Sequence, residues 1–259
     1  MRIVTLVENS SCREELGCEH GLSLYIETGE HRILFDMGQS GLFLQNAAQM
    51  GIDLAKVDLA VLSHGHYDHG GGLAAFLEVN HRAPVYVQRT AFDRHLNGKG
   101  GDIGLNPKWK DHPRMILTED NHTLVPGITL QTCNRRPLAY PIQPFGQQMA
   151  EGNGFFSEDY RHEQYLLVEE DGKRICISGC SHKGIQNIVH WFRPDILVGG
   201  FHLMKLENRE ELEKIADNLA KSPTVYYTGH CTGQNQFRVM QLILGDRLRE
   251  ISTGTMLEL

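Results

Sequence analysis

Long apolar runs, an excess of basic residues and closely spaced cysteine pairs are all missing from this 259-residue sequence. No apolar run approaches the ~18 residues of a membrane span, and the apolar run within residues 1–10 is too short for a secretory signal and is followed by Glu8. Lys and Arg number 25 against 32 for Asp and Glu, which gives a formal net charge of −7. Because nucleic acids and anionic membranes attract basic proteins, we expect neither as a partner.

The six cysteines include no C-x-x-C pair. In a chain without a predicted signal sequence, isolated cysteines are typical of reduced thiols, so we expect a cytoplasmic protein. A chain of this length buries a core without disulfides. No segment has the composition of a linker, and we therefore predict one domain over residues 1–259.

Short apolar segments alternate with helical patterns. Strands are predicted at residues 3–7, 22–26, 32–35, 58–62, 85–88, 166–169, 173–177, 196–198, 224–227 and 255–257. Helices are predicted at residues 41–50, 73–79, 209–220 and 236–244. Antiparallel strands early and strand–helix units late predict a layered α/β (α+β) fold. Residues 93–114 and 141–156 show neither pattern, and are expected to be binding loops, lids or plain surface excursions.

Four potential metal ligands fall within six residues directly after a predicted strand: His64, His66, Asp68 and His69. Three glycines follow at 70–72 and allow close backbone approach in an irregular turn. Three imidazoles and a carboxylate suit zinc, iron or manganese better than calcium or magnesium. Because four ligands exceed what one open site takes from one segment, the motif predicts a two-metal site.

Three more histidines, His182, His202 and His230, each follow a predicted strand. Ligands of layered α/β proteins bind outside the carboxyl ends of the strands. Any one of these histidines alone is typical of a satisfied core or capping residue. Together they predict convergence on the site of the 64–69 motif.

The motif His64-x-His66-x-Asp68-His69 after an apolar strand resembles the signature of the metallo-β-lactamase superfamily. The sequences Leu-Phe-Asp-Met-Gly at 34–38 and Gly-His-Cys at 229–231 extend the resemblance along nearly the whole chain. Segments 8–10, 19–23, 179–182, 199–203 and 228–233 together resemble one subgroup. Its archaeal members include 7,8-dihydropterin-6-methyl-4-(β-D-ribofuranosyl)aminobenzene 5′-phosphate synthase.

The resemblance implies a four-layer αβ/βα sandwich that holds two divalent transition-metal ions, zinc first and iron or manganese as alternatives. His64 and His66 would hold one ion, and Asp68, His69 and His230 the other. Cys180 replaces the usual bridging aspartate, so it is either a thiolate ligand, which suits zinc, or a pocket-lining residue. The third histidine of the first ion is His182, with His162 as its rival.

Other residues carry weaker expectations. We predict His202 as a substrate-binding or acid–base residue, with ligation as the lesser option. Glu19 and His20 either bind substrate or form a polar turn. Asp36 is expected to organise the turn through hydrogen bonds without touching metal, and Cys231 to be an inert thiol. The basic residues beside Trp109 either grip a phosphate or form a solvated loop, and these are Lys99, Lys108, Lys110 and Arg114.

Metal-bound water is a nucleophile near neutral pH, and Asp68 would orient it or accept its proton. The sequence therefore predicts a metal-dependent hydrolase of a small soluble substrate, with phosphorylated compounds among the candidates. One alternative is a transferase that condenses a dihydropterin pyrophosphate with an aminobenzene-ribose phosphate, as the subgroup implies. A second is a diiron redox or sensor protein. The sequence is compatible with both a monomer and a homo-oligomer.

Overall fold

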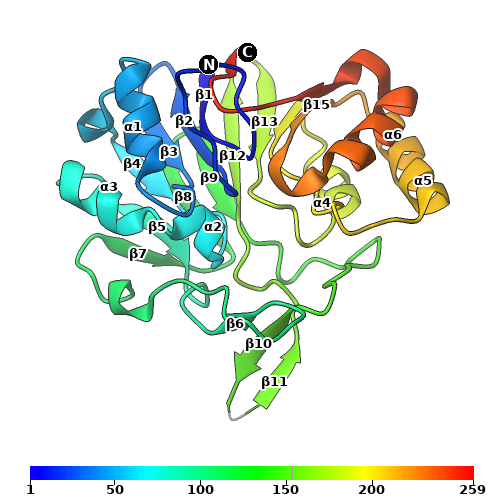
Figure 1. The fold of residues 1–259 in the computed structure, drawn as a ribbon, viewed down its shortest axis with the longest axis horizontal. Helices are drawn as coiled ribbons and strands as arrows, with labels where there is room; N and C mark the ends of the chain where they lie inside the picture. Colours follow the sequence, from blue (N-terminus) through cyan, green and yellow to red (C-terminus); the bar gives the residue numbers. More distant parts are fainter. Residues whose placement is uncertain (153) are drawn as a thin grey trace.

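The computed structural model describes residues 1–152 and 154–259. Two seven-stranded sheets face each other, and helices cover the outer face of each, which gives four layers (Figure 1). The two chain ends lie side by side at the same edge of the sandwich (Figure 1), where the backbone of Leu259 donates to that of Met1. The predicted four-layer αβ/βα sandwich is confirmed.

The first sheet contains, in spatial order, β17 (Met256–Glu258), β1 (Arg2–Val7), β2 (Ser23–Glu27), β3 (Arg32–Phe35), β4 (Leu59–Val61), β5 (Val85–Gln88) and β7 (Met115–Thr118). The second contains β16 (Leu248–Glu250), β15 (Val225–Thr228), β14 (Ile196–Val198), β13 (Lys173–Ile177), β12 (Tyr165–Glu170), β9 (Ile128–Gln131) and β8 (Asn121–Val125). Strands β3, β4, β5 and β7 run parallel, as do β13 to β16. Their carboxyl ends therefore gather at one edge of each sheet.

The helices divide between the two sheets along the chain. They are α1 (Leu42–Gln49), α2 (Tyr67–Gly70), α3 (Leu73–Val79), α4 (Ile185–Phe192), α5 (Arg209–Ala220) and α6 (Gln234–Leu244). Short 3₁₀ turns occupy Leu54–Lys56, Pro107–Trp109, His230–Thr232 and Gly245–Arg247. Helices α1 and α3 lie against the first sheet, and α4 to α6 against the second (Figure 1). Within the described residues, no helix has the length and apolar character needed to cross a bilayer.

The side-chain alternation of the strands fills three apolar layers. Ile33 and Phe35 of β3 pack between the sheets, whereas Leu34 packs under the helices of the first half. On β14, Ile196 and Val198 face the opposite sheet, and Leu197 faces the helices. Because both faces of these strands are covered, their sequences are continuously apolar rather than alternating.

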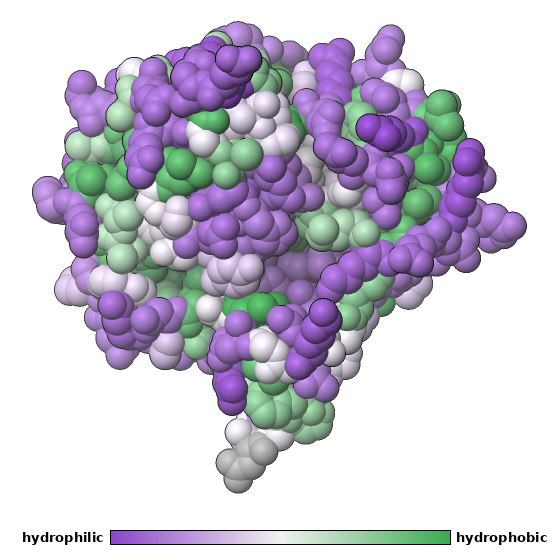
Figure 2. Space-filling model, in the orientation of Figure 1, coloured by the Kyte–Doolittle hydropathy of each residue, from purple (hydrophilic) through white to green (hydrophobic). Residues whose placement is uncertain are grey.

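The prediction for residues 93–114 and 141–156 was wrong in part. β6 (His95–Leu96), β10 (Gln148–Glu151) and β11 (Gly154–Ser157) form a three-stranded arm that projects from the sandwich (Figure 1). β10 pairs with β6, and this pairing joins segments about fifty residues apart, which no local pattern reveals. Figure 2 shows a hydrophobic patch on the arm, where Phe155 and Phe156 are exposed, on a face that is otherwise mostly hydrophilic.

Candidate metal centre

The predicted ligands meet where the carboxyl ends of β4, β13 and β15 come together. His64 follows β4, His182 follows β13 and His230 follows β15. The side chains of all three histidines are buried. The structure therefore places residues from both sheets around one centre, as expected from their positions after strands.

The turn after β4 approaches neighbouring backbone very closely. A Cβ atom at Gly65 would collide with the carbonyl oxygen of Ala91, and one at Gly72 with that of Met37. His66 has extended backbone and precedes α2, whose first turn carries Asp68. The glycines thus allow the turn to pack directly against the backbone of these neighbouring segments, while its His and Asp side chains point to the centre.

A first donor group consists of His64, His66 and His182, whose ligand atoms all lie within 4.8 Å of one another. The Nε2 atoms of His64 and His182 are 3.2 Å apart. Burial, the largest cause, holds the pKa of each of the three histidines well below its usual value. These imidazoles are therefore neutral at neutral pH and keep a lone pair for a metal.

A second donor group consists of Asp68, His69 and His230. Nε2 of His230 lies 3.1 Å from Nε2 of His69 and 3.3 Å from Oδ2 of Asp68. Burial would raise the pKa of Asp68, but the neighbouring histidines, His69 first, hold it well below its usual value. Burial likewise opposes the charged form of His230, yet the hydrogen bond to Asp68 raises the pKa of His230 to about 9. A metal at this group would take the place of that proton.

Cys180 lies between the two donor groups. Its Sγ is 3.1 Å from Nε2 of His69, and it forms possible ligand sets with His64 and His69 and with His182 and His202. Burial, with Cys231 beside it, raises the pKa of the Cys180 thiol well above its usual value. The sulfur is thus placed to bind metal, and would do so as a thiolate.

Hydrogen bonds fix the orientation of the donor histidines. Asp36 accepts from the backbone N–H and the hydroxyl of Ser63 and lies 2.6 Å from Nδ1 of His69. The Ser63 hydroxyl is also 2.8 Å from Nδ1 of His64. These contacts leave the Nε2 atoms of both histidines for the centre, as carboxylate–histidine pairs do in metal sites. Asp36 organises the turn by hydrogen bonds, as its sequence position suggested.

Two residues that orient His230 were not singled out from the sequence. Asn9 Oδ1 is 2.9 Å from Nδ1 of His230, and Glu8 accepts from the backbone N–H of His230. Segment 8–10 contributed to the family resemblance, so the signal was present. The role of this segment in orienting His230 could not be predicted, because it depends on β1 and β15 ending side by side.

The remaining predicted residues lie at different distances from the centre. The pocket beside it is lined by His20, His66, Tyr67, Asp68, Asn97, Ile103, Phe145, Gln147, Cys180, His182, His202, Met204, Lys205, His230 and Cys231. Nε2 of His20 lies 3.3 Å from Oδ2 of Asp68. His202 is half-buried, and neither of its buried ring nitrogens has a hydrogen-bond partner.

Glu19 lies elsewhere: its carboxylate accepts hydrogen bonds from the backbone N–H groups of Gln39 and Ser40 and from the Ser40 hydroxyl. This matches the polar-turn alternative. The basic residues near Trp109 do not line the pocket, and Lys205 is instead the lysine that does. Lys108 lies over the Trp109 ring, and Arg114 donates to backbone carbonyls of Leu77 and Ala83.

His162 is buried, and its Nδ1 accepts a hydrogen bond from the backbone N–H of Gly65. The first donor group therefore contains His182, and His162 belongs to a neighbouring cluster described below.

The donor residues fit divalent transition-metal ions. The Nε2 atoms of His69 and His230 lie 3.1 Å apart, and those of His64 and His182 lie 3.2 Å apart. Both rings of the second pair are neutral at neutral pH. Nε2 of His66 and Nδ1 of His182 are buried without a hydrogen-bond partner. Nitrogen, sulfur and one carboxylate form a donor set typical of zinc or iron.

Comparisons with known proteins agree with this geometry. The sequence profile of the metallo-beta-lactamase superfamily matches residues 16–130. A 7,8-dihydropterin-6-methyl-4-(β-D-ribofuranosyl)-aminobenzene-5′-phosphate synthase from Methanocaldococcus jannaschii is 28% identical over 258 residues, covering 90% of this chain and 88% of its own. An uncharacterized protein of the same organism is 28% identical over 243 residues, covering 89% and 90%.

The crystal structure of Tm1679, a metal-dependent hydrolase of the β-lactamase superfamily, superposes with a TM-score of 0.87. It is 27% identical and covers 100% of this chain and 99% of its own. On its sequence, its fold and the placement of its signature residues, the chain is similar to the metallo-β-lactamase superfamily and has the metallo-β-lactamase fold.

Proposed function

We propose that this protein is a metal-dependent hydrolase of a small anionic substrate that works with two divalent ions, zinc first. The observation that carries the proposal is the pair of donor groups that share Cys180 and open onto one pocket. Three ligands for each ion leave coordination positions for water and substrate, which is typical of catalytic rather than structural sites.

The residues around the pocket support a hydrolytic mechanism. Metal ions bound at the two groups would lower the pKa of a coordinated water toward neutrality. Asp68 is anionic at neutral pH and held near His20 and His230, so it can orient the nucleophile and accept its proton. The unpartnered ring nitrogens of His202 make it a candidate to protonate the leaving group.

An anionic substrate is favoured by the positive charge that Lys205 and the bound metal ions would give the pocket. Lys205 is exposed where it lines the pocket, and His20 lies beside Asp68 at the same opening. The two metal ions would dominate the local field despite the net charge of −7. Phosphoesters, which carry negative charge, are therefore the first substrates to screen, and neutral lactones and other small esters are the comparison.

The test combines metal analysis, substrate screening and the Asp68→Asn variant. An amide carries no charge and is a poor base, so we expect turnover to fall at least about 10²-fold while the fold is kept. Asp217→Asn, on the exposed side of α5, is the matched control and should behave like the parent. Parent-like turnover by Asp68→Asn at full metal content would refute the proposal.

A transferase is the second candidate, because the similarity to the synthase extends over 90% of this chain. In that reaction the residues of the centre would hold a pyrophosphate leaving group while a carbon nucleophile attacks. Incubation with a dihydropterin pyrophosphate and an aminobenzene-ribose phosphate, followed by mass spectrometry, separates the two. A coupled product indicates the transferase, and products that incorporate labelled water indicate the hydrolase. Iron with a visible absorption band would instead favour the diiron alternative.

A further inference from the structure

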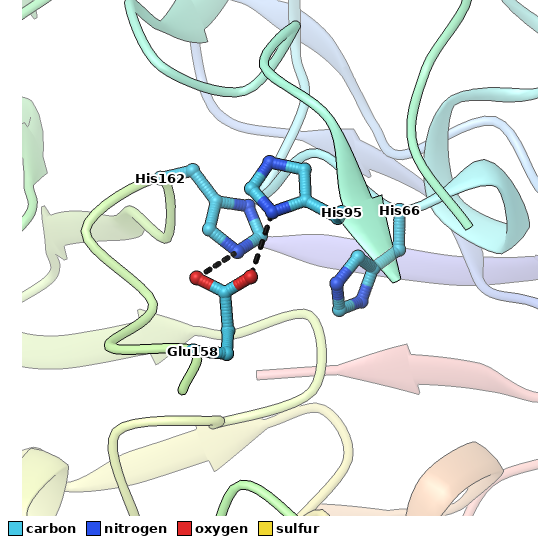
Figure 3. Close-up of side chains that lie close together, drawn as sticks. All are labelled: His66, His95, Glu158 and His162. Carbon is cyan, nitrogen blue, oxygen red and sulfur yellow. Dashed lines mark hydrogen bonds and ion pairs between the residues drawn. The ribbon is translucent and has the colours of Figure 1, made fainter. Parts of the chain in front are cut away.

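A second group of buried metal-binding side chains lies beside the donor groups: His66, His95, Glu158 and His162 (Figure 3). Their ligand atoms lie within 4.8 Å of one another, and each residue is at most 4% exposed. His95 comes from β6, Glu158 and His162 from the segment between β11 and β12, and His66 from the turn before α2. Three segments far apart in the chain thus bring four ligands to one place.

Glu158 is at the middle of this cluster, and Figure 3 shows both neighbouring histidine rings turned toward its carboxylate. Oε2 of Glu158 is 2.7 Å from Nδ1 of His95, and Oε1 is 3.6 Å from Nε2 of His162. The backbone N–H of Gly65 donates to Nδ1 of His162, so the ring proton of His162 lies on Nε2, the atom that faces Glu158. The cluster is therefore held in shape from outside as well as from within.

The charges of the cluster are incompletely balanced by protein groups. Among the described residues, Glu158 forms ion-pair contacts with His95 and His162 only, and its Oε1 also accepts a hydrogen bond from the backbone N–H of Tyr160. The Nε2 atoms of His66, His95 and His162 are buried and have no hydrogen-bond partner. A buried carboxylate among unsatisfied imidazoles is costly unless a cation completes it.

We propose that His66, His95, Glu158 and His162 form an additional metal site that takes a divalent ion of the zinc class. Three imidazoles and one carboxylate make a complete four-coordinate set. The set is closed, since all four residues are buried and His66 alone among them lines the pocket. A neutral imidazole offers one lone pair, so His66 would bind at both this site and the first donor group as an imidazolate, and an ion here would also displace the Nε2 proton of His162.

The proposed site would have a structural role. β6 belongs to the projecting arm, and His66 belongs to the turn that carries the donor residues of the centre. A metal ion there would fasten the arm to that turn, and so would hold pocket-lining residues such as Asn97 and Gln147 in place. This proposal does not depend on the reaction proposed above.

The experiment loads the parent, Glu158→Gln and His95→Asn with excess zinc(II), removes unbound metal and counts zinc per chain. We expect the parent to retain one equivalent more than either variant, and its melting temperature to rise further on loading. His81→Asn, an exposed histidine, is the control and should match the parent. Equal zinc content in the parent and both folded variants would overturn the proposal.

Anomalous diffraction from zinc-soaked crystals of the parent decides the case if the variants do not fold. A peak among His95, Glu158 and His162 supports the additional site, and no peak there while the two donor groups are loaded overturns it. Peaks at this site alone would keep the additional site and remove the proposed two-metal centre. The two proposals can therefore fail separately.

Discussion

At the scale of single residues, Cys180 distinguishes this centre from the pattern that its family resemblance implies. An aspartate at that position would be ionised at neutral pH on its own. The buried Cys180 thiol has a raised pKa and would lose its proton only when a cation is bound. Metal binding at Cys180 would therefore be coupled to proton release more strongly than binding at a carboxylate.

We predict that Cys180→Ser weakens metal binding at one donor group at least about tenfold, because a serine hydroxyl is a poor replacement for a thiolate. In cobalt(II)-loaded protein, the sulfur-to-cobalt charge-transfer absorption should disappear with Cys180→Ser. Cys231→Ser is the comparison variant, because Cys231 is as buried as Cys180 and forms a possible ligand set with Cys180 and His230, and it should keep the band if Cys180 is the sulfur ligand. Retention of the band in Cys180→Ser, or its loss only in Cys231→Ser, would contradict this assignment.

At the scale of elements, the turn between β4 and α3 is tightly constrained by neighbouring backbone. It supplies His64, His66, Asp68 and His69 within one short segment, and its glycines touch backbone on three sides. Backbone carbonyls cannot rotate away as a flexible side chain can. A side chain added at these positions must therefore displace the turn itself.

Gly65→Ala should destabilise the metal-free protein by about 1–3 kcal/mol, the usual cost of overpacking, and should also reduce metal content by shifting His64 and His66. The control is Gly41→Ala, because a Cβ there meets only Ala75 Cβ at 3.6 Å. Its effect should stay within about 0.5 kcal/mol. Urea unfolding and elemental analysis of both variants provide the test, and similar behaviour of the two would show that the turn tolerates displacement.

At the scale of the whole molecule, neutral histidines buried at the centre link the stability of the metal-free protein to pH. His64, His66, His162 and His182 all have a lowered pKa, mainly because of burial. An unfolded histidine takes up a proton near pH ~6.5. Below that pH the unfolded chain binds more protons than the folded one, so acid destabilises the fold.

His230 has the opposite effect in a different pH range. Its pKa of about 9 means that the folded state holds a proton which the unfolded state loses near pH ~6.5. The stabilisation from His230 is therefore complete below that value and is lost as the pH rises toward about 9. These opposing contributions predict maximum stability of the metal-free protein near pH ~6.5.

Urea unfolding of the metal-free protein as a function of pH checks this prediction. For each histidine that stays neutral in the folded state, the free energy of unfolding falls by at most about 1.4 kcal/mol per pH unit as the pH drops below ~6.5, and these contributions set the acid slope. His162→Asn should reduce that slope, whereas exposed His81→Asn should leave it unchanged. A free energy of unfolding that does not change between neutral and mildly acidic pH would contradict the prediction.

The sequence by itself determined the parts of this protein that depend on neighbouring residues. The strands Arg32–Phe35 and Lys173–Ile177 and the helix Arg209–Ala220 were predicted with the bounds they have. Their apolar periodicity and turn residues are local signals. The ligand spacing of the 64–69 turn is local as well, which is why four residues of the centre could be named from the sequence.

Tertiary structure decided everything that depends on which distant segments meet. It placed His182 rather than His162 beside His64, put Cys180 between the two donor groups and turned Glu19 toward Ser40. It also paired β6 with β10 and so brought His95 to Glu158, a contact across 63 residues. No spacing rule predicts such contacts, because they follow from how the two sheets and the arm pack, and packing depends on the whole chain at once.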